Sequence, residues 1–260
     1  MMRTNDLVIG LFVVALLLAA CGDGDRTVSP SASSASASSS PPRQVHARFG
    51  GALVSIPAEF AQGVEYDGEP TWKPVPGDAG ERRGNDPKIK SFGFEFRYPD
   101  KTGPANKAAA QERARLSPAD SPWIFVGLKS GELYPGPGGV QRIAAGVLNT
   151  PDPRTGAAYA RAAQDTCGLE TYVLQGELTQ AQREDAKDIF VARDGTGQAR
   201  TFLECSNRSV RSAPCTQRFD LEPRLHASVY LLYPRTQMCE WSGIQQATRE
   251  VTESFIRPSR

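Results

Sequence analysis

The stretch Phe92-Gly93-Phe94-Glu95-Phe96-Arg97-Tyr98-Pro99 is the clearest strand signal in this sequence. Its aromatic residues alternate with glycine or charged residues, so one face of the segment is aromatic and the other is polar. Because side chains along a strand point to opposite faces with a period of two, the pattern predicts a half-buried strand. The proline at its end predicts that the strand stops there.

Other short strands are expected on both sides of this segment, with few helices between them. Before it we expect a strand at 52–56 and a polar surface loop at 63–87. After it we expect a surface helix at 105–116, a buried strand at 123–128, a turn-rich loop at 131–139 and a short helix at 157–164. The C-terminal half predicts strands at 169–174, 189–193, 201–205, 215–221 and 227–233, with Asp194-Gly195 as a hairpin turn.

The last element is an amphipathic helix at about 237–257, ended by Pro258. Its apolar stripe is formed by Met238, Trp241, Ile244, Thr248, Val251 and Phe255. Such a stripe is typical of a helix packed on a core, so we expect it to lie across the sheet. The prediction is an α+β fold with mainly antiparallel sheet(s) and a C-terminal helix packed on the sheet, in two lobes or small domains that meet near residue 155.

The N-terminal region predicts export. An uncharged apolar run from Leu7 ends in Leu18-Ala19-Ala20-Cys21, and it is shorter than the roughly 20 residues that a membrane-spanning helix needs. It is typical of a signal peptide at residues 1–20, and an ordinary secretory signal is the alternative. The last four residues resemble the lipobox of bacterial lipoproteins, which implies lipid on Cys21.

The Ser/Ala-rich residues 21–44 would then form a disordered tether, and residues 45–260 the folded periplasmic part. In the lipoproteins that the lipobox resembles, an Asp directly after the lipidated cysteine favours inner-membrane retention. Here Gly22 holds that position, which favours the outer membrane. The protein would touch the membrane through the lipid anchor alone.

Four cysteines remain after Cys21: Cys167, Cys205, Cys215 and Cys239. In an oxidising compartment an even number of cysteines predicts disulfides, and three pairings are possible. We favour Cys205–Cys215, which would close a short polar loop between two strands, together with Cys167–Cys239. No C-x-x-C pair exists, so a metal site is not expected.

No cofactor, nucleic acid or catalytic residue is predicted. The formal net charge is +1, which gives no basic footprint for nucleic acid. The glycines at 136, 138 and 139 alternate with prolines and precede no clear helix, so they predict no phosphate-binding loop. The usual hydrolase motifs are missing, and we expect no enzymatic activity. The alternative is a hydrolase in which His226 lies in a polar cleft near a serine or a carboxylate.

The loop between Cys205 and Cys215 is the predicted partner-binding segment. Arg208 and Arg211 lie in it, and a disulfide would limit the entropy that the loop loses on binding. Arginine is also enriched at protein interfaces. A solvated basic loop without a binding role is the alternative.

Taken in order, these features resemble periplasmic immunity lipoproteins that protect bacteria from type VI secretion lipase effectors. The residues behind the resemblance are the lipobox, Val54-Ser55-Ile56-Pro57, Phe94-Glu95-Phe96-Arg97-Tyr98-Pro99-Asp100, the Cys205, Cys215 and Phe219 run, and Trp241, Ile244 and Phe255. The resemblance implies a non-enzymatic protein that binds a secreted phospholipase effector and blocks it. The alternative is an envelope assembly or maintenance lipoprotein without enzymatic activity.

Overall fold

The computed structural model describes residues 43–68, 87–104 and 107–258, which belong to one compact unit, Pro41–Arg260. The predicted signal peptide, Cys21 and all but the end of the tether lie outside the described residues. The strands are β1 (Gln44–Phe49), β2 (Ala52–Pro57), β3 (Gln62–Tyr66), β4 (Ile89–Arg97), β5 (Trp123–Ser130), β6 (Tyr159–Arg161), β7 (Glu170–Leu174), β8 (Lys187–Arg193), β9 (Ala199–Ser206), β10 (Pro214–Asp220) and β11 (Ala227–Pro234). The helices are α1 (Lys107–Arg115), α2 (Gly139–Asn149), α3 (Gln180–Asp185) and α4 (Trp241–Ser254), with short 3₁₀ helices η1 (Ala58–Phe60), η3 (Gly131–Leu133) and η4 (Arg235–Glu240).

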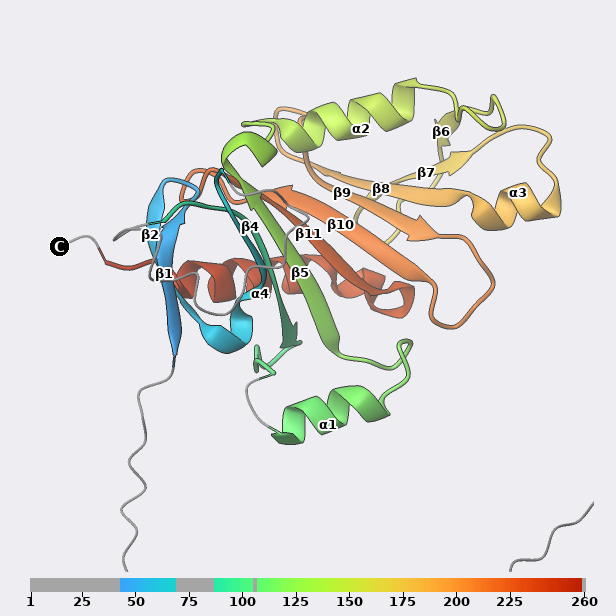
Figure 1. The fold of residues 1–260 in the computed structure, drawn as a ribbon. Coiled ribbons are helices and arrows are strands. Elements are labelled where there is room, and N and C mark those ends of the chain that lie inside the picture. Colours follow the sequence, from blue (N-terminus) through green and yellow to red (C-terminus); the bar gives the residue numbers. More distant parts are fainter. Residues whose placement is uncertain (1–42, 69–86, 105–106, 259–260) are drawn as a thin grey trace, which may run out of the picture. The chain divides into compact units, whose positions relative to one another are not determined.

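Nine strands form one antiparallel sheet in the order β3-β4-β5-β11-β10-β9-β8-β7-β6 (Figure 1). The sheet takes strands from both sides of residue 155. A separate hairpin, β1-β2, packs against the same core through buried Phe49 and Ile56. The predicted α+β fold with a mainly antiparallel sheet and a C-terminal helix is confirmed.

The predicted aromatic strand lies in β4, which is paired on both sides, with β3 and β5. Phe92, Phe94 and Phe96 are buried at 4%, 0% and 0% exposure. On the opposite face, Arg97 is partly exposed, and the carboxylate of Glu95 lies at 2.6 Å from Arg113 Nη2 of α1. The period of two therefore separates a dry face from a polar face, as predicted.

Helix α4 covers the aromatic face of the sheet. Its buried residues Ile244, Val251 and the following Phe255 join the main core, and the ring centroids of Phe255 and Phe94 lie 5.6 Å apart at an interplanar angle of 81°. The expected C-terminal helix is confirmed as α4, although residues 237–240 at its predicted start belong to the 3₁₀ helix η4 and α4 ends at Ser254.

The expectation that the glycines at 136, 138 and 139 precede no clear helix was wrong, although a loop is present at 134–138 within the predicted 131–139. Helix α2 begins at Gly139, directly after the glycines, and packs Val140 and Ala144 against Ile189, Val191 and Phe202 in a second core. Gly138 adopts a φ of 75°, and the Asp220 carboxyl accepts a hydrogen bond from the Val140 backbone N–H. A residue from β10 therefore supports the first turn of α2.

The predicted helix at 157–164 was also wrong, because Tyr159–Arg161 forms the edge strand β6, paired with β7. The Asp152 carboxylate accepts hydrogen bonds from the Arg154 and Thr155 backbone N–H groups and holds a turn just before it. Pairing with β7 outweighs the helix propensity of a short alanine-containing segment. Strands β1 and β3 and helix α3 were not predicted, whereas the Asp194-Gly195 hairpin is confirmed between β8 and β9.

Candidate functional site

Two cysteine pairs lie at disulfide distance, and they are the two pairs that the sequence favours. Cys205 and Cys215 face each other across β9 and β10, are fully buried, and have an S–S distance of 1.92 Å. Cys167 and Cys239 have an S–S distance of 1.91 Å and join the segment before β7 to η4. The indole Nε1–H of Trp241 donates a hydrogen bond to the Cys167 carbonyl at 3.1 Å, which adds a second link at this point.

The loop closed by Cys205 and Cys215 carries both predicted partner-binding arginines. Arg208 Nη2 lies 2.7 Å from Asp185 Oδ1, and Arg211 Nη2 lies 2.6 Å from Asp120 Oδ1. The two side chains remain 62% and 76% exposed. Ion pairs between exposed side chains are weak and screened by salt, so either arginine could exchange its carboxylate for one on a partner. Their binding role stays a prediction.

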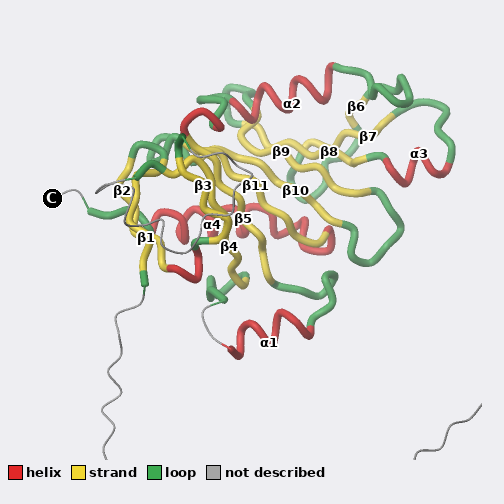
Figure 2. Tube along the Cα trace, viewed as in Figure 1, coloured by secondary structure: helices red, strands yellow, loops and turns green. Residues whose placement is uncertain are grey.

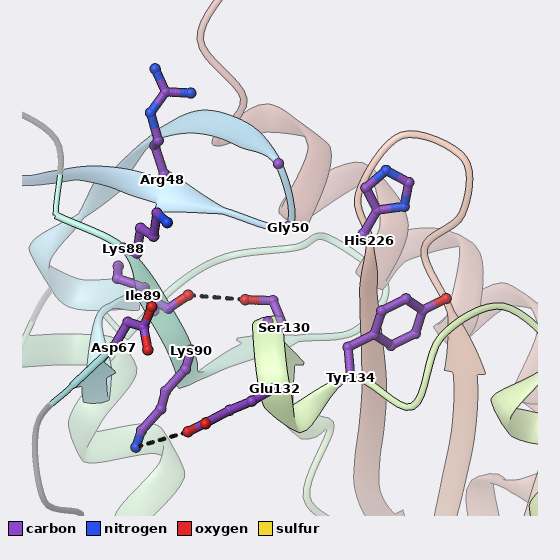
Figure 3. Close-up of a pocket in the computed structure, with 12 residues that line it drawn as sticks. Arg48, Gly50, Asp67, Lys88, Ile89, Lys90, Ser130, Glu132, Tyr134 and His226 are labelled. Atoms are coloured by element: carbon purple, nitrogen blue, oxygen red, sulfur yellow. Dashed lines mark hydrogen bonds and ion pairs between the residues drawn. The ribbon is translucent and has the colours of Figure 1, made fainter.

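A cavity of about 350 Å³ lies beside His226 (Figure 3). It is bordered by the β1-β2 turn at Gly50, by Lys88 and Lys90 at the start of β4, and by Ser130 at the end of β5. Lys90 is only 7% exposed, and its Nζ lies 3.7 Å from Glu132 Oε1. The cavity is therefore lined by charged side chains of both signs.

His226 forms a hydrogen-bonded chain at the mouth of this cavity. Its Nδ1 lies 2.8 Å from Glu222 Oε1, and the Tyr134 hydroxyl donates to the same oxygen at 3.0 Å. The hydrogen bond with His226 lowers the pKa of Glu222, with a further contribution from Tyr134, while burial and the bond to Glu222 raise the pKa of Tyr134. The His226 side chain is 68% exposed.

The geometry supplies a histidine and a carboxylate, as the hydrolase alternative requires, but no activated nucleophile. Ser130 is the serine that lines the cavity, and its Oγ donates to the Ile89 carbonyl at 2.9 Å, away from His226 (Figure 3). Within residues 43–68, 87–104 and 107–258, no hydroxyl or thiol is hydrogen-bonded to the His226 ring. A serine hydrolase needs that contact, because the base removes the proton of the attacking hydroxyl.

Sequence reasoning singled out His226 but missed Glu222 and Tyr134. The i, i+4 spacing of Glu222 and His226 could have indicated the first partner, whereas Tyr134 is brought in by tertiary contacts. Across the described part of the chain, no group of three or more His, Cys, Asp or Glu residues is placed to bind a metal ion. No helix in the same residues is both long and apolar enough to span a bilayer.

Comparison with known proteins gives a likeness of fold. No protein-family model and no curated protein matches the sequence. A solved structure of Smlt3025, described as an immunity protein of the Stenotrophomonas maltophilia type IV secretion system, matches with a TM-score of 0.52 and 17% sequence identity. The match covers 84% of this chain and 94% of that one. The two chains therefore share an architecture over nearly their whole folded length.

Proposed function

We propose that this protein is an immunity protein, which binds a toxic protein effector and neutralises it. The observation that carries the proposal is the fold likeness to Smlt3025, because it extends over 94% of a chain described as an immunity protein. The arrangement at His226 fits this function better than a hydrolase, since its imidazole pairs with the Glu222 carboxylate and no hydroxyl or thiol of the described residues is hydrogen-bonded to it.

The finer proposal is a periplasmic lipoprotein, anchored through Cys21 and preferentially in the outer membrane, that blocks a phospholipase delivered by a type VI secretion system. The lipobox resemblance and the resemblance to lipase-effector immunity lipoproteins support it. Smlt3025 is described as belonging to a type IV system, so an effector of that kind is the second candidate. Both candidates require a protein partner that reaches the periplasm.

The test is to co-express the full-length chain with the product of the adjacent gene, directed to the periplasm. We expect that product alone to stop growth, the full-length chain to restore growth, and the two proteins to co-purify. Phospholipid hydrolysis in the intoxicated cells would identify a lipase. Absence of toxicity, or of a complex, contradicts the immunity function.

Two variants separate the alternatives. His226→Ala should protect as well as the unsubstituted chain, and loss of protection with retained binding would indicate an enzyme instead. Cys21→Ala should leave the membrane fraction. An envelope assembly or maintenance lipoprotein would instead give a defect on deletion in pure culture, without any attacking effector.

A further inference from the structure

The face of the sheet opposite α4 is covered by helices at its two ends (Figures 1 and 2). At one end, α1 packs over β4, where Arg97 Nη1 lies 2.7 Å from Glu112 Oε2. At the other end, α2 packs over β8 and β9. Strands β5, β11 and β10 lie between these helices, and we call the α1–α2 face the side of these three strands that carries Phe125, Lys129, Arg218, Tyr230 and Leu232.

The α1–α2 face is apolar at its centre. Leu232 is 44% exposed on the central strand β11. Next to it, the Tyr230 ring lies over Gly127, so that a Cβ built on this glycine would meet Tyr230 Cε1 at 2.0 Å. The ring centroids of Tyr230 and Phe125 are 5.8 Å apart. An aromatic pair and an exposed leucine thus form a ridge across the sheet.

A hollow lies on each side of this ridge. The larger, of about 470 Å³, lies between α1 and β11 and is lined by Trp123, Phe125 and Leu232. The smaller, of about 250 Å³, lies between η3, the start of α2 and the sheet, and is lined by Leu133, Ile143 and Tyr230. Two of the three exposed large hydrophobic side chains in the described residues, Leu133 and Leu232, line these hollows.

The charged side chains around the smaller hollow are mainly positive. Lys129 and Arg218 line it together with one carboxyl, that of Asp220, whereas the Glu95 and Arg113 side chains that line the larger hollow are paired with each other. Lys129 is exposed and has no ion pair with any described residue, and Arg218 Nε lies 3.8 Å from Glu204 Oε2, beyond hydrogen-bonding distance. A partner that buried this face would have to supply a carboxylate, because a desolvated cation without a counter-charge is costly.

From these features we propose that the α1–α2 face is the effector-docking surface of this protein. The partner is a protein that places apolar side chains in the two hollows and a carboxylate against Lys129 and Arg218. Buried aliphatic and aromatic anchors surrounded by polar residues are the usual source of binding energy in such interfaces. This inference rests on the proposed immunity function and adds the surface and the chemistry of the partner.

The α1–α2 face is a better candidate than the disulfide-closed loop. Arg208 and Arg211 of the loop would first have to give up their carboxylate partners Asp185 and Asp120, at 2.7 Å and 2.6 Å, whereas Lys129 has none among the described residues to give up. Val210 is 54% exposed in the loop but lines neither hollow. The loop could contribute to the rim of the interface, since Arg211 ties it to Asp120 in the segment between α1 and β5.

The test uses the full-length chain and the product of the adjacent gene, with affinity measured at two salt concentrations. Leu232→Glu should weaken binding by about 30-fold or more, because it places a charge where an apolar anchor is expected. Lys129→Glu should weaken binding by about 10-fold, mainly through slower association, and should reduce its salt dependence. Leu232→Ala removes apolar surface without adding a charge, so it should lower the affinity by a smaller factor if Leu232 is an apolar anchor.

Ser242→Glu is the matched control, since it adds the same charge at an exposed position on α4, on the other side of the sheet. It should bind like the unsubstituted chain. Circular dichroism and the melting temperature verify folding, which should persist because Leu232 and Lys129 are exposed. Unchanged affinity of folded Leu232→Glu overturns the proposed docking surface. A loss of affinity in Val210→Glu, in the disulfide-closed loop, without any loss in Leu232→Glu overturns it as well. If the unsubstituted chain does not bind, the proposed immunity function fails as well.

Discussion

Breaking the bond between Cys167 and Cys239 should destabilise the folded part by an amount that the chain-entropy relation gives directly. The two cysteines are separated by 72 positions, so reconnecting them closes a long loop in the unfolded chain. A loop of that length corresponds to about 4 kcal/mol at 25 °C. Both side chains are partly or fully exposed, so replacement by alanine removes little packing. Most of the loss in Cys167→Ala/Cys239→Ala should therefore come from the missing cross-link.

The measurement is equilibrium unfolding in urea under oxidising conditions, followed by circular dichroism. The single variants should lose as much stability as the double variant, because either one breaks the bond. Cys205→Ala/Cys215→Ala is the comparison: its separation of 10 positions predicts about 3 kcal/mol from the loop, with an added loss because both cysteines are fully buried. A loss below about 1 kcal/mol for the 167/239 pair would refute this account of its stabilising role.

Three further outcomes follow from the sheet and its margins. Phe94→Ala should lower the free energy of unfolding in urea by about 3–5 kcal/mol, because this fully buried ring contacts four others. The hydrogen bonds from Arg97 lower the pKa of Asp100 to about 2, below its unfolded value of about 3.9. Their contribution to stability is thus complete above pH ~4 and is lost as the pH falls through about 2. In the Asp100→Asn variant, the melting temperature should therefore depend less on pH in that window. Burial raises the pKa of Glu95 and Arg113 opposes this, so Arg113→Ala should raise it further. That variant should lose more stability at pH 8 than at pH 5, and equal losses would contradict the assignment.

The elements that could be predicted are those with strong local periodicity. β4 alternates aromatic and polar residues, and α4 carries a continuous apolar stripe, so each pattern defines the buried side without knowledge of a partner. β6 carries a weaker signal, whereas α2 has an apolar stripe at helical spacing, Val140, Ile143, Ala144, Val147 and Leu148, that the prediction overlooked. β6 is three residues long and is defined by its pairing with β7, and α2 is supported at its start by Asp220 from a distant strand.

The candidate sites divide in the same way. The sequence indicated His226, Arg208, Arg211 and the four cysteines, because residue type and spacing are visible along the chain. It did not indicate the α1–α2 face. Leu232 occurs there in a strand whose other residues are mostly buried, and only its exposure in the assembled sheet distinguishes it.

The amino-acid sequence by itself determined the class of fold, since the alternation along strands and the apolar stripe of the helix specify which side of each element is buried. The tertiary structure alone decided which strands are neighbours and where the helices lie. β5 pairs with β11 although five strands, β6 to β10, and the helices α2 and α3 lie between them in the chain. With α1 and α2 at opposite ends of the sheet (Figure 1), that pairing leaves Leu232 exposed and Tyr230 partly exposed among the described residues. Such contacts join distant parts of the chain, and no local pattern specifies them.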